Sequence, residues 1–275
     1  MELSRKIKYK WEVLRAVAFV TYKEWSAYRT HSLVSVFVGP VYFLVQYFIW
    51  TALYGTNGSL AGIGLEQMIR YFGASALIGY LTMDFADWNL QMLVRTGKYL
   101  TFTLRPVHHR FFALSQKIGH RILGFFFEFL PCLVIFVLLF KIPMIPKHFI
   151  WTSLSVALAF LMNFYVNYCL GLTAFWLTKA DGLRHVYGLI AQIFSGSLIP
   201  LVFFPEFLQR LLFLLPFQYT LYVPAMVWTG NYYVGNVELE IPQIVGIQAA
   251  ATLVMLAVSE VLYRLSLKRF TGVGA

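Results

Sequence analysis

The chain of 275 residues is too apolar for a soluble globular protein, because 59% of its residues are hydrophobic and only 12% are charged. Its net charge of +10 would suit nucleic acid, but the basic residues lie between apolar segments and form no separable soluble domain. This distribution is typical of the loops of a membrane protein. We therefore predict a single all-α polytopic transmembrane domain over residues 1–275, with no nucleic-acid partner.

Residues 1–31 are predicted to form an interfacial amphipathic helix. Basic side chains are interleaved with apolar ones such as Trp11, Leu14 and Ala18, which recur at roughly helical spacing. Such a helix lies in the headgroup region of a bilayer, with its basic face on anionic lipid. A partly disordered basic leader is the alternative.

Six apolar segments are predicted to span the bilayer, since a helix of about 20 residues crosses a hydrocarbon core. They are residues 32–54, 71–89, 122–140, 150–177, 186–204 and 242–263. The first contains Gly39 and Pro40, where the proline ring removes a backbone hydrogen bond and is expected to kink the helix.

The longest polar segment, residues 84–121, follows the second span and carries six Lys and Arg side chains. Basic loops are retained in the cytoplasm, so this segment is predicted to lie there. Gly97 is well placed to end one helix, and Pro106 forces an extended residue before the next. Two short helices with a corner between them are expected.

We interpret residues 90–121, called the bridge below, as a coupling segment on which a cytoplasmic partner pushes. An apolar patch is expected to anchor in a groove of that partner, while basic residues steer docking or bind anionic lipid. The corner would fix the angle at which motion of the partner reaches the second and third spans. The residues assigned to these roles are Leu90, Leu93, Val94, Arg95, Gly97, Lys98, Arg105 and Pro106. A solvated basic loop is the alternative.

The segment 205–231 is apolar and aromatic, but prolines divide it into pieces too short to cross a membrane. A pair of re-entrant or interfacial helices on the outer face is the expected solution. An outer gate is assigned to Phe203, Phe204, Pro205, Pro216 and Phe217. Core packing without gating is the alternative.

Charge supports this topology. With both termini in the cytoplasm, 18 of the 22 Lys and Arg residues lie on the inner side and four on the outer side. The outer ones are Arg70, Lys141, Lys147 and Arg210. Such an excess favours six spans with both ends inside.

Signs of catalytic chemistry are few. The chain contains no GxxxxGK[ST] phosphate loop. Asp84 and Asp87 share a helical face and would suit Mg²⁺, but local pairing with the basic bridge is the favoured interpretation. No metal site or cofactor is therefore expected in this chain.

A carboxylate inside an apolar span is costly, so Glu128 is either functional or paired with a basic residue of the bundle. Glu260 precedes Arg264 by four residues and is expected to pair with it. A possible substrate path is assigned to Glu128, Asn163, Asn167, Gln192 and Ser195.

Two runs of residues carry a resemblance to a known family. The first, in the bridge, fits a G-x-L…L-[RK]-P pattern and comprises Gly97, Leu100, Leu104, Arg105 and Pro106. The second comprises Pro200, Leu201, Phe203, Phe204, Pro205, Leu215, Pro216, Phe217, Gln218, Tyr219, Tyr222, Pro224, Ala225 and Gly230. Over nearly its whole length, the chain resembles the membrane subunits of ABC-2 type exporters, in the bacterial branch whose partners are daunorubicin-resistance-like ATPases.

The resemblance implies the same interfacial helix, six spans, coupling helix and outer re-entrant helices. It also implies a partner, a dimer of ATPase subunits on a separate chain that binds ATP and Mg²⁺, and a second permease subunit that is identical or homologous. The expected protein is a non-enzymatic permease that exports a substrate across the bacterial cytoplasmic membrane and contacts its lipids.

Two other classes stay open. An ion-coupled secondary transporter would use a carboxylate such as Glu128 and would commonly show repeat symmetry, which is not apparent in the sequence. A membrane enzyme would need a larger cluster of acidic residues.

Overall fold

The apolar segments form helices, as their composition predicts. The computed structural model describes residues 2–26, 34–55, 58–177, 181–234 and 237–269. The α-helices are α1 (Glu2–Ser26), α3 (Val38–Tyr54), α4 (Leu65–Thr82), α5 (Ala86–Arg95), α6 (Leu100–Thr103), α7 (His109–Gly124), α8 (Leu130–Leu138), α9 (Phe149–Leu172), α10 (Asp181–Phe194), α11 (Glu206–Leu214), α12 (Phe217–Thr220), α13 (Tyr222–Thr229) and α14 (Ile241–Arg269).

Shorter elements connect them. A π-helix, η1 (Phe125–Phe129), joins α7 to α8 without a break, and two 3₁₀ turns are η2 (Thr173–Phe175) and η3 (Leu201–Phe203). Two antiparallel hairpins are formed by β1 (Ser59–Leu60) with β2 (Ile63–Gly64) and by β3 (Tyr233–Val234) with β4 (Val237–Glu238).

Three helical segments are long and apolar enough to cross a membrane, by length and composition: His109–Leu138, Phe149–Phe175 and Ile241–Arg269. They correspond to the predicted third, fourth and sixth spans; the sixth is wholly contained, and the third and fourth end two residues before their predicted ends. The apolar helix Val38–Tyr54 is shorter and corresponds to the first, whose predicted start at residues 32–33 lies outside the described residues. The count of six spans stays a prediction.

Two predicted spans end earlier than the sequence suggested. The second stops at Thr82, because the Asp84 side chain accepts hydrogen bonds from the backbone N–H groups of Phe85 and Ala86 and turns the chain into α5. The fifth stops at Phe194, and the chain then turns at Gly196, whose φ is +85°.

The predicted interruption of the first span is present, but it lies just before the Gly39–Pro40 pair rather than at it. Regular helix is interrupted at Val36 and Phe37, and α3 then starts at Val38. Gly39 and Pro40 therefore stand in its first turn, where the missing proline N–H removes no intrahelical bond. The Gly39 N–H donates instead to the Tyr80 hydroxyl.

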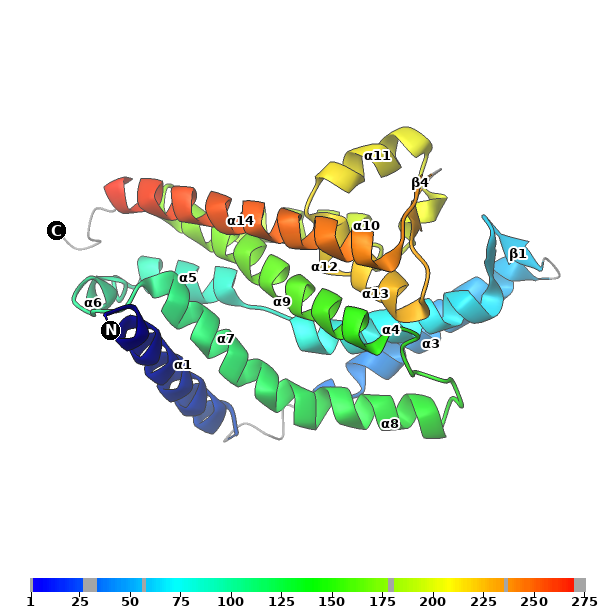
Figure 1. Ribbon diagram of the computed structural model, residues 1–275, viewed down its shortest axis with the longest axis horizontal. Helices are drawn as coiled ribbons and strands as arrows, with labels where there is room; N and C mark the ends of the chain where they lie inside the picture. The colour runs from blue at the N-terminus through cyan, green and yellow to red at the C-terminus, as the bar shows by residue number, and fades with distance from the viewer. Residues whose placement is uncertain (1, 27–33, 56–57, 178–180, 235–236, 270–275) are drawn as a thin grey trace.

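The helices form an elongated bundle (Figure 1). α9 and α14 lie side by side, α1 runs along α7, and α3 packs on α4. The start of α1, helices α5 and α6, and the end of α14 lie at one end of the molecule, which we call the bridge end. The β1–β2 hairpin lies at the opposite end.

The centre of the bundle surrounds α13. Every residue of α13 is buried, and its Tyr222, Val223 and Val227 belong to a core shared with α4 and α9. By contrast, α11 exposes Phe207, Leu211 and Leu214. The proline-broken segment thus does form short helices, as predicted, while its placement in a membrane stays a prediction.

The N-terminal segment is helical over α1, as predicted, although residues 27–31 lie outside the described residues. Its packing on α7 depends on Gly119. A β-carbon at this position would lie 2.8 Å from the Cα of Ala18, which is backbone and cannot rotate away. That α1 lies in a membrane interface stays a prediction.

We expect Gly119→Val to separate α1 from α7, since such overpacking costs about 1–3 kcal/mol. In a chain whose two cysteines are replaced by alanine, a cysteine at the buried Thr21 should react with maleimide at least about fivefold faster. Gly79→Val is the control, because nothing lies within 4 Å of its added β-carbon. Equal labelling in both variants would contradict the packing.

Candidate functional site

The bridge has the predicted corner. Gly97 has a φ of +70° and directly follows the last turn of α5, and the Tyr99 N–H returns to the Leu93 carbonyl at 3.0 Å. After α6, the chain leaves helical geometry around Pro106, and α7 begins at His109. α7 then continues through η1 into α8, so the structure has no break at the predicted boundary between bridge and third span.

Two of the three predicted anchors are not on the surface. Leu90 is 1% exposed and Val94 is 6% exposed, because both pack in a core with Tyr165, Tyr168 and Leu172. Leu93 is partly buried against the same core. Leu90 and Val94 fix α5 to α9, which corrects their assignment as contacts for a partner.

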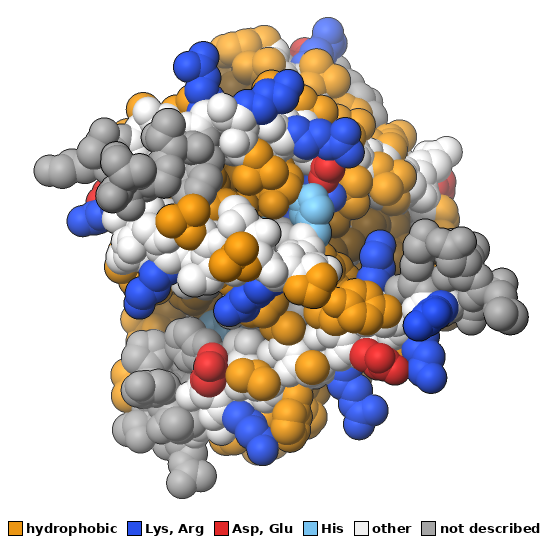
Figure 2. Space-filling model, turned by 90° about the vertical axis from the view of Figure 1, so that its left-hand side faces the viewer, with side chains coloured by type: hydrophobic (Ala, Val, Ile, Leu, Met, Phe, Trp, Pro, Cys, Tyr) orange, Lys and Arg blue, Asp and Glu red, His pale blue; other side chains and the backbone are white. Residues whose placement is uncertain are grey.

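The exposed surface of the bridge end is nevertheless both apolar and basic. Arg95, Lys98 and Arg105 are exposed, as a docking rim requires. The exposed apolar side chains beside them are Trp88, Met92, Leu100 and Leu104. We call these seven residues the bridge face. Figure 2 views this end of the molecule, where Lys and Arg side chains are spread among hydrophobic ones.

Ion pairs hold the ends of α5. Just before α5, Asp84 lies 3.6 Å from the Lys117 ammonium of α7. Within α5, Asp87 pairs with Arg184 of α10 at 2.6 Å. Asp84 thus meets a cation of the bridge, as the sequence favoured, whereas Asp87 meets Arg184, which lies outside the bridge.

A third pair, Arg95 with Asp181 at 3.5 Å, is exposed on both sides and contributes little by itself. Together with the buried Asp87 carboxylate, however, it ties both ends of α5 to the first half of α10.

Glu260 ties the start of α7 to α14. It pairs with Arg264 at 2.7 Å, as predicted, and also with Arg110 at 2.9 Å. Beside this cluster, the His108 ring packs on Tyr263 with centroids 4.5 Å apart, and burial lowers the pKa of His108. The bridge is therefore connected by polar contacts to α10 and to α14.

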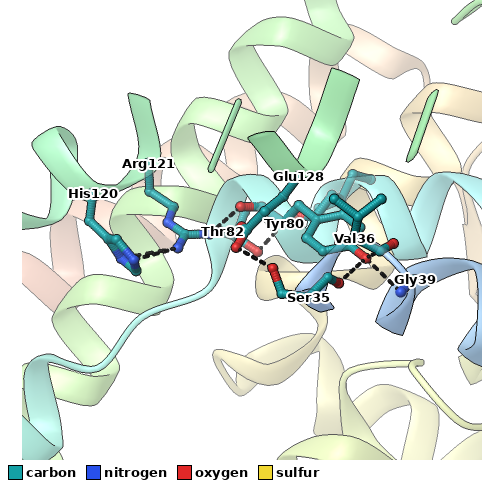
Figure 3. A network of polar contacts seen from close by, with 9 residues as sticks. Ser35, Val36, Gly39, Tyr80, Thr82, His120, Arg121 and Glu128 are labelled. Carbon is teal, nitrogen blue, oxygen red and sulfur yellow. Dashed lines mark hydrogen bonds and ion pairs between the residues drawn. The ribbon is translucent and has the colours of Figure 1, made fainter. Parts of the chain in front are cut away.

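A second polar site surrounds Glu128, inside the π-helix (Figure 3). Its carboxylate accepts a hydrogen bond from the Ser35 hydroxyl at 2.8 Å and lies 3.5 Å from the Arg121 guanidinium. Arg121 also donates to the backbone carbonyl of Tyr80, near the end of α4. Of the two alternatives left open for Glu128, the structure shows the carboxylate paired with a basic residue of the bundle.

Local backbone geometry allows this arrangement. Residues Arg121 and Glu128 are seven apart, so they project from the same side of the continuous helix. An added β-carbon at Gly124, between them, would lie 3.0 Å from the Glu128 carboxylate and 3.1 Å from Arg121. Glycine at this position leaves room for the ion pair, and π-bulges of this kind are frequent at functional sites.

The Glu128 network joins three segments of the chain. Tyr80 donates through its hydroxyl toward the carbonyls of Ser35 and Val36 at 2.9 and 2.8 Å. The entry to α3, the last turns of α4 and the π-helix are thereby held together (Figure 3). Sequence reasoning selected Glu128 but missed Arg121, although the spacing of seven residues was a readable signal.

The other predicted path residues do not gather around Glu128. Asn163 of α9 donates to the Thr220 carbonyl at 3.4 Å, and Asn167 is half-buried on the same helix. Gln192 is exposed, whereas Ser195 is buried just after α10. A shared path through these residues stays a proposal.

The predicted gate residues pack within the chain. Phe203 contacts Trp50 of α3 with ring centroids 4.9 Å apart, and Phe204 and Phe217 both approach Phe194 of α10, at 6.0 and 6.1 Å. Pro205 and Pro216 stand directly before α11 and α12 and set where these helices begin.

Removing the Glu128 charge should destabilise the protein, since an unpaired buried charge costs about 3–5 kcal/mol. We expect Glu128→Gln to lower the melting temperature in detergent, and the double variant Glu128→Gln with Arg121→Gln to recover part of the loss. Glu206→Gln, which breaks the exposed pair with Arg210, is the matched control and should change stability by at most about 1 kcal/mol. Additive losses in the double variant would contradict a buried pair.

Comparison with known proteins identifies the family. A family model described as ABC-2 family transporter protein matches residues 41–274, which include the bridge, the Arg121–Glu128 pair and the proline-broken helices. No curated protein and no solved structure matches the chain. The match extends over most of the sequence, and the chain belongs to the ABC-2 transporter family of multi-pass membrane proteins.

Proposed function

We propose that this chain is the permease subunit of an ATP-binding cassette exporter in the bacterial cytoplasmic membrane. Substrate leaves the cell through the membrane domain, and a dimer of cytoplasmic ATPase subunits hydrolyses ATP with Mg²⁺ on separate chains. A second permease subunit, identical or homologous, completes the transporter. The resemblance to permeases paired with daunorubicin-resistance-like ATPases supports this assignment of partner.

The proposal rests on the contacts that connect the bridge end to the long helices. A partner that presses on the bridge face presses on α5, whose buried side is packed on α9 and whose carboxylate is paired with α10. Glu260 connects the next part of the bridge to α14. Displacement of this surface therefore reaches the long helices through contacts that are already formed.

An ion-coupled secondary transporter is a weaker candidate. It would need a carboxylate that exchanges ions during transport. Glu128 is the buried carboxylate suggested for that role, but Arg121 compensates its charge and Ser35 occupies one of its oxygens. The Glu128–Arg121 pair therefore favours a structural role for Glu128 within the proposed path. The proposed outer gate of Phe203, Phe204 and Phe217 is apolar and needs no ion.

Coupling is tested by adding charge to the exposed apolar part of the bridge face. We expect Met92→Asp with Leu104→Asp to weaken binding of the ATPase encoded beside this chain at least roughly 30-fold, because central apolar contacts cost about 2 kcal/mol or more when lost. The measurement is co-purification of the two proteins, followed by ATP hydrolysis and transport in vesicles.

The matched control for this experiment is Leu214→Asp. Leu214 is 81% exposed and Leu104 is 87% exposed, but Leu214 lies on α11, away from the bridge end. The control should retain the ATPase. Retention of the ATPase and full transport by the double variant would overturn the assignment of the bridge face.

Topology is tested by labelling. The predicted cytoplasmic bridge and the predicted outer loop after span five both offer exposed positions, Thr101 and Glu238. Single cysteines at these positions should react with an impermeant maleimide from opposite sides of the membrane, Glu238→Cys in intact cells and Thr101→Cys only after the inner face is opened. Reaction of both in intact cells would exclude the six-span arrangement.

A further inference from the structure

A cleft of about 470 Å³ lies between α3, the beginning of α4 and the segment that follows α8. Its apolar wall includes Phe43, Tyr47 and Phe140; the Phe43 ring lies 6.1 Å from Tyr47 and 5.2 Å from Phe140, between centroids. Two cations, Arg70 and Lys141, line the same cleft. It is therefore an amphipathic site, and it lies outside the bridge face.

Positive charge exceeds negative charge in this cleft. Glu66, which is the acidic residue of the lining, pairs with Arg70 at 2.6 Å and is itself largely exposed to solvent. The Arg70 Nε atom is buried and has no hydrogen-bond acceptor. Within the described part of the chain, Lys141 takes part in no ion pair with an acidic residue. A ligand with a negative group would therefore meet donors that the protein leaves unused.

The backbone at Lys141 is also unusual. Its φ is +55°, in the left-handed region that residues other than glycine rarely adopt. Non-glycine residues held in this way cluster at ligand-binding positions. This conformation places an exposed lysine directly after the apolar helix α8.

Exposed apolar side chains continue from the cleft along the neighbouring helices. Val45 and Phe48 are exposed on α3, and Leu138 and Leu139 are exposed at the end of α8. In a membrane protein such surfaces face hydrocarbon. A chain of methylene groups can thus pass from the bilayer to the aromatic wall without crossing a polar surface.

We propose that the cleft binds an anionic phospholipid, with its phosphate near Lys141 and the partly exposed Arg70 guanidinium and one acyl chain against Phe43, Tyr47 and Phe140. The two cations account for the negative headgroup, since hydrogen bonds between charged groups are the stronger ones. The aromatic wall accounts for the acyl chain, which a free phosphate ion lacks. The proposal requires a membrane protein but no ATPase partner.

The test uses the purified full-length chain in a neutral detergent, with bound lipid counted by native mass spectrometry. Phosphatidylglycerol should bind about tenfold more tightly than phosphatidylcholine, and Lys141→Asn and Arg70→Gln should each lower phosphatidylglycerol affinity by about tenfold. Asparagine tolerates the left-handed backbone, so Lys141→Asn removes charge with little effect on folding. Lys141→Arg should restore binding.

Arg210→Gln is the matched control. Arg210 also pairs with a glutamate one turn away at 2.6 Å, but it lies on α11 and does not line the cleft, so the variant should bind lipid like the original chain. Equal affinity for phosphatidylcholine, unchanged binding in Lys141→Asn and Arg70→Gln, or displacement of the lipid by inorganic phosphate would each overturn the proposal. Because neither ATP nor transport is measured, these outcomes are independent of the proposed export function.

Discussion

A charged side chain inside an apolar bundle is stable only when another charge or a strong hydrogen bond compensates it, and this constraint organises the molecule. Lys117 meets Asp84 where α4 gives way to α5, and Arg121 meets Glu128 where α7 widens into a π-helix. At each of these places the backbone departs from a regular α-helix. Two of the irregular points of the bundle are thus points at which buried charge is paired.

Much of the fold could be predicted from local sequence chemistry. Proline is favoured at the start of a helix, and glycine accepts the left-handed conformation, so the short helices after Pro205 and the end of α5 at Gly97 followed from single residues. The α14 helix, an apolar run without a proline in its interior, also matched its predicted span closely.

Features that depend on tertiary contacts were less predictable. Helix α5 has two apolar sides, one with Leu90 and Val94 and one with Trp88 and Met92. The pattern alone does not say which side meets α9; the aromatic side chains of α9, distant in sequence, select the first. Likewise, Glu128 was recognisable as a buried carboxylate, but its bond to Ser35 joins residues 93 positions apart.

The continuity of α7, η1 and α8 has a mechanical consequence. Thirty residues of continuous helix lead from the bridge end toward Lys141, and the helix bends at η1, so that α7 and α8 form two arms at an angle (Figure 1). A displacement of His109 can reach Leu138 only through this bend, where the Arg121 and Glu128 side chains are paired. A lipid bound beside Lys141 would resist movement of α8. The free energy needed to move α8 would then depend on the lipid composition of the surrounding bilayer.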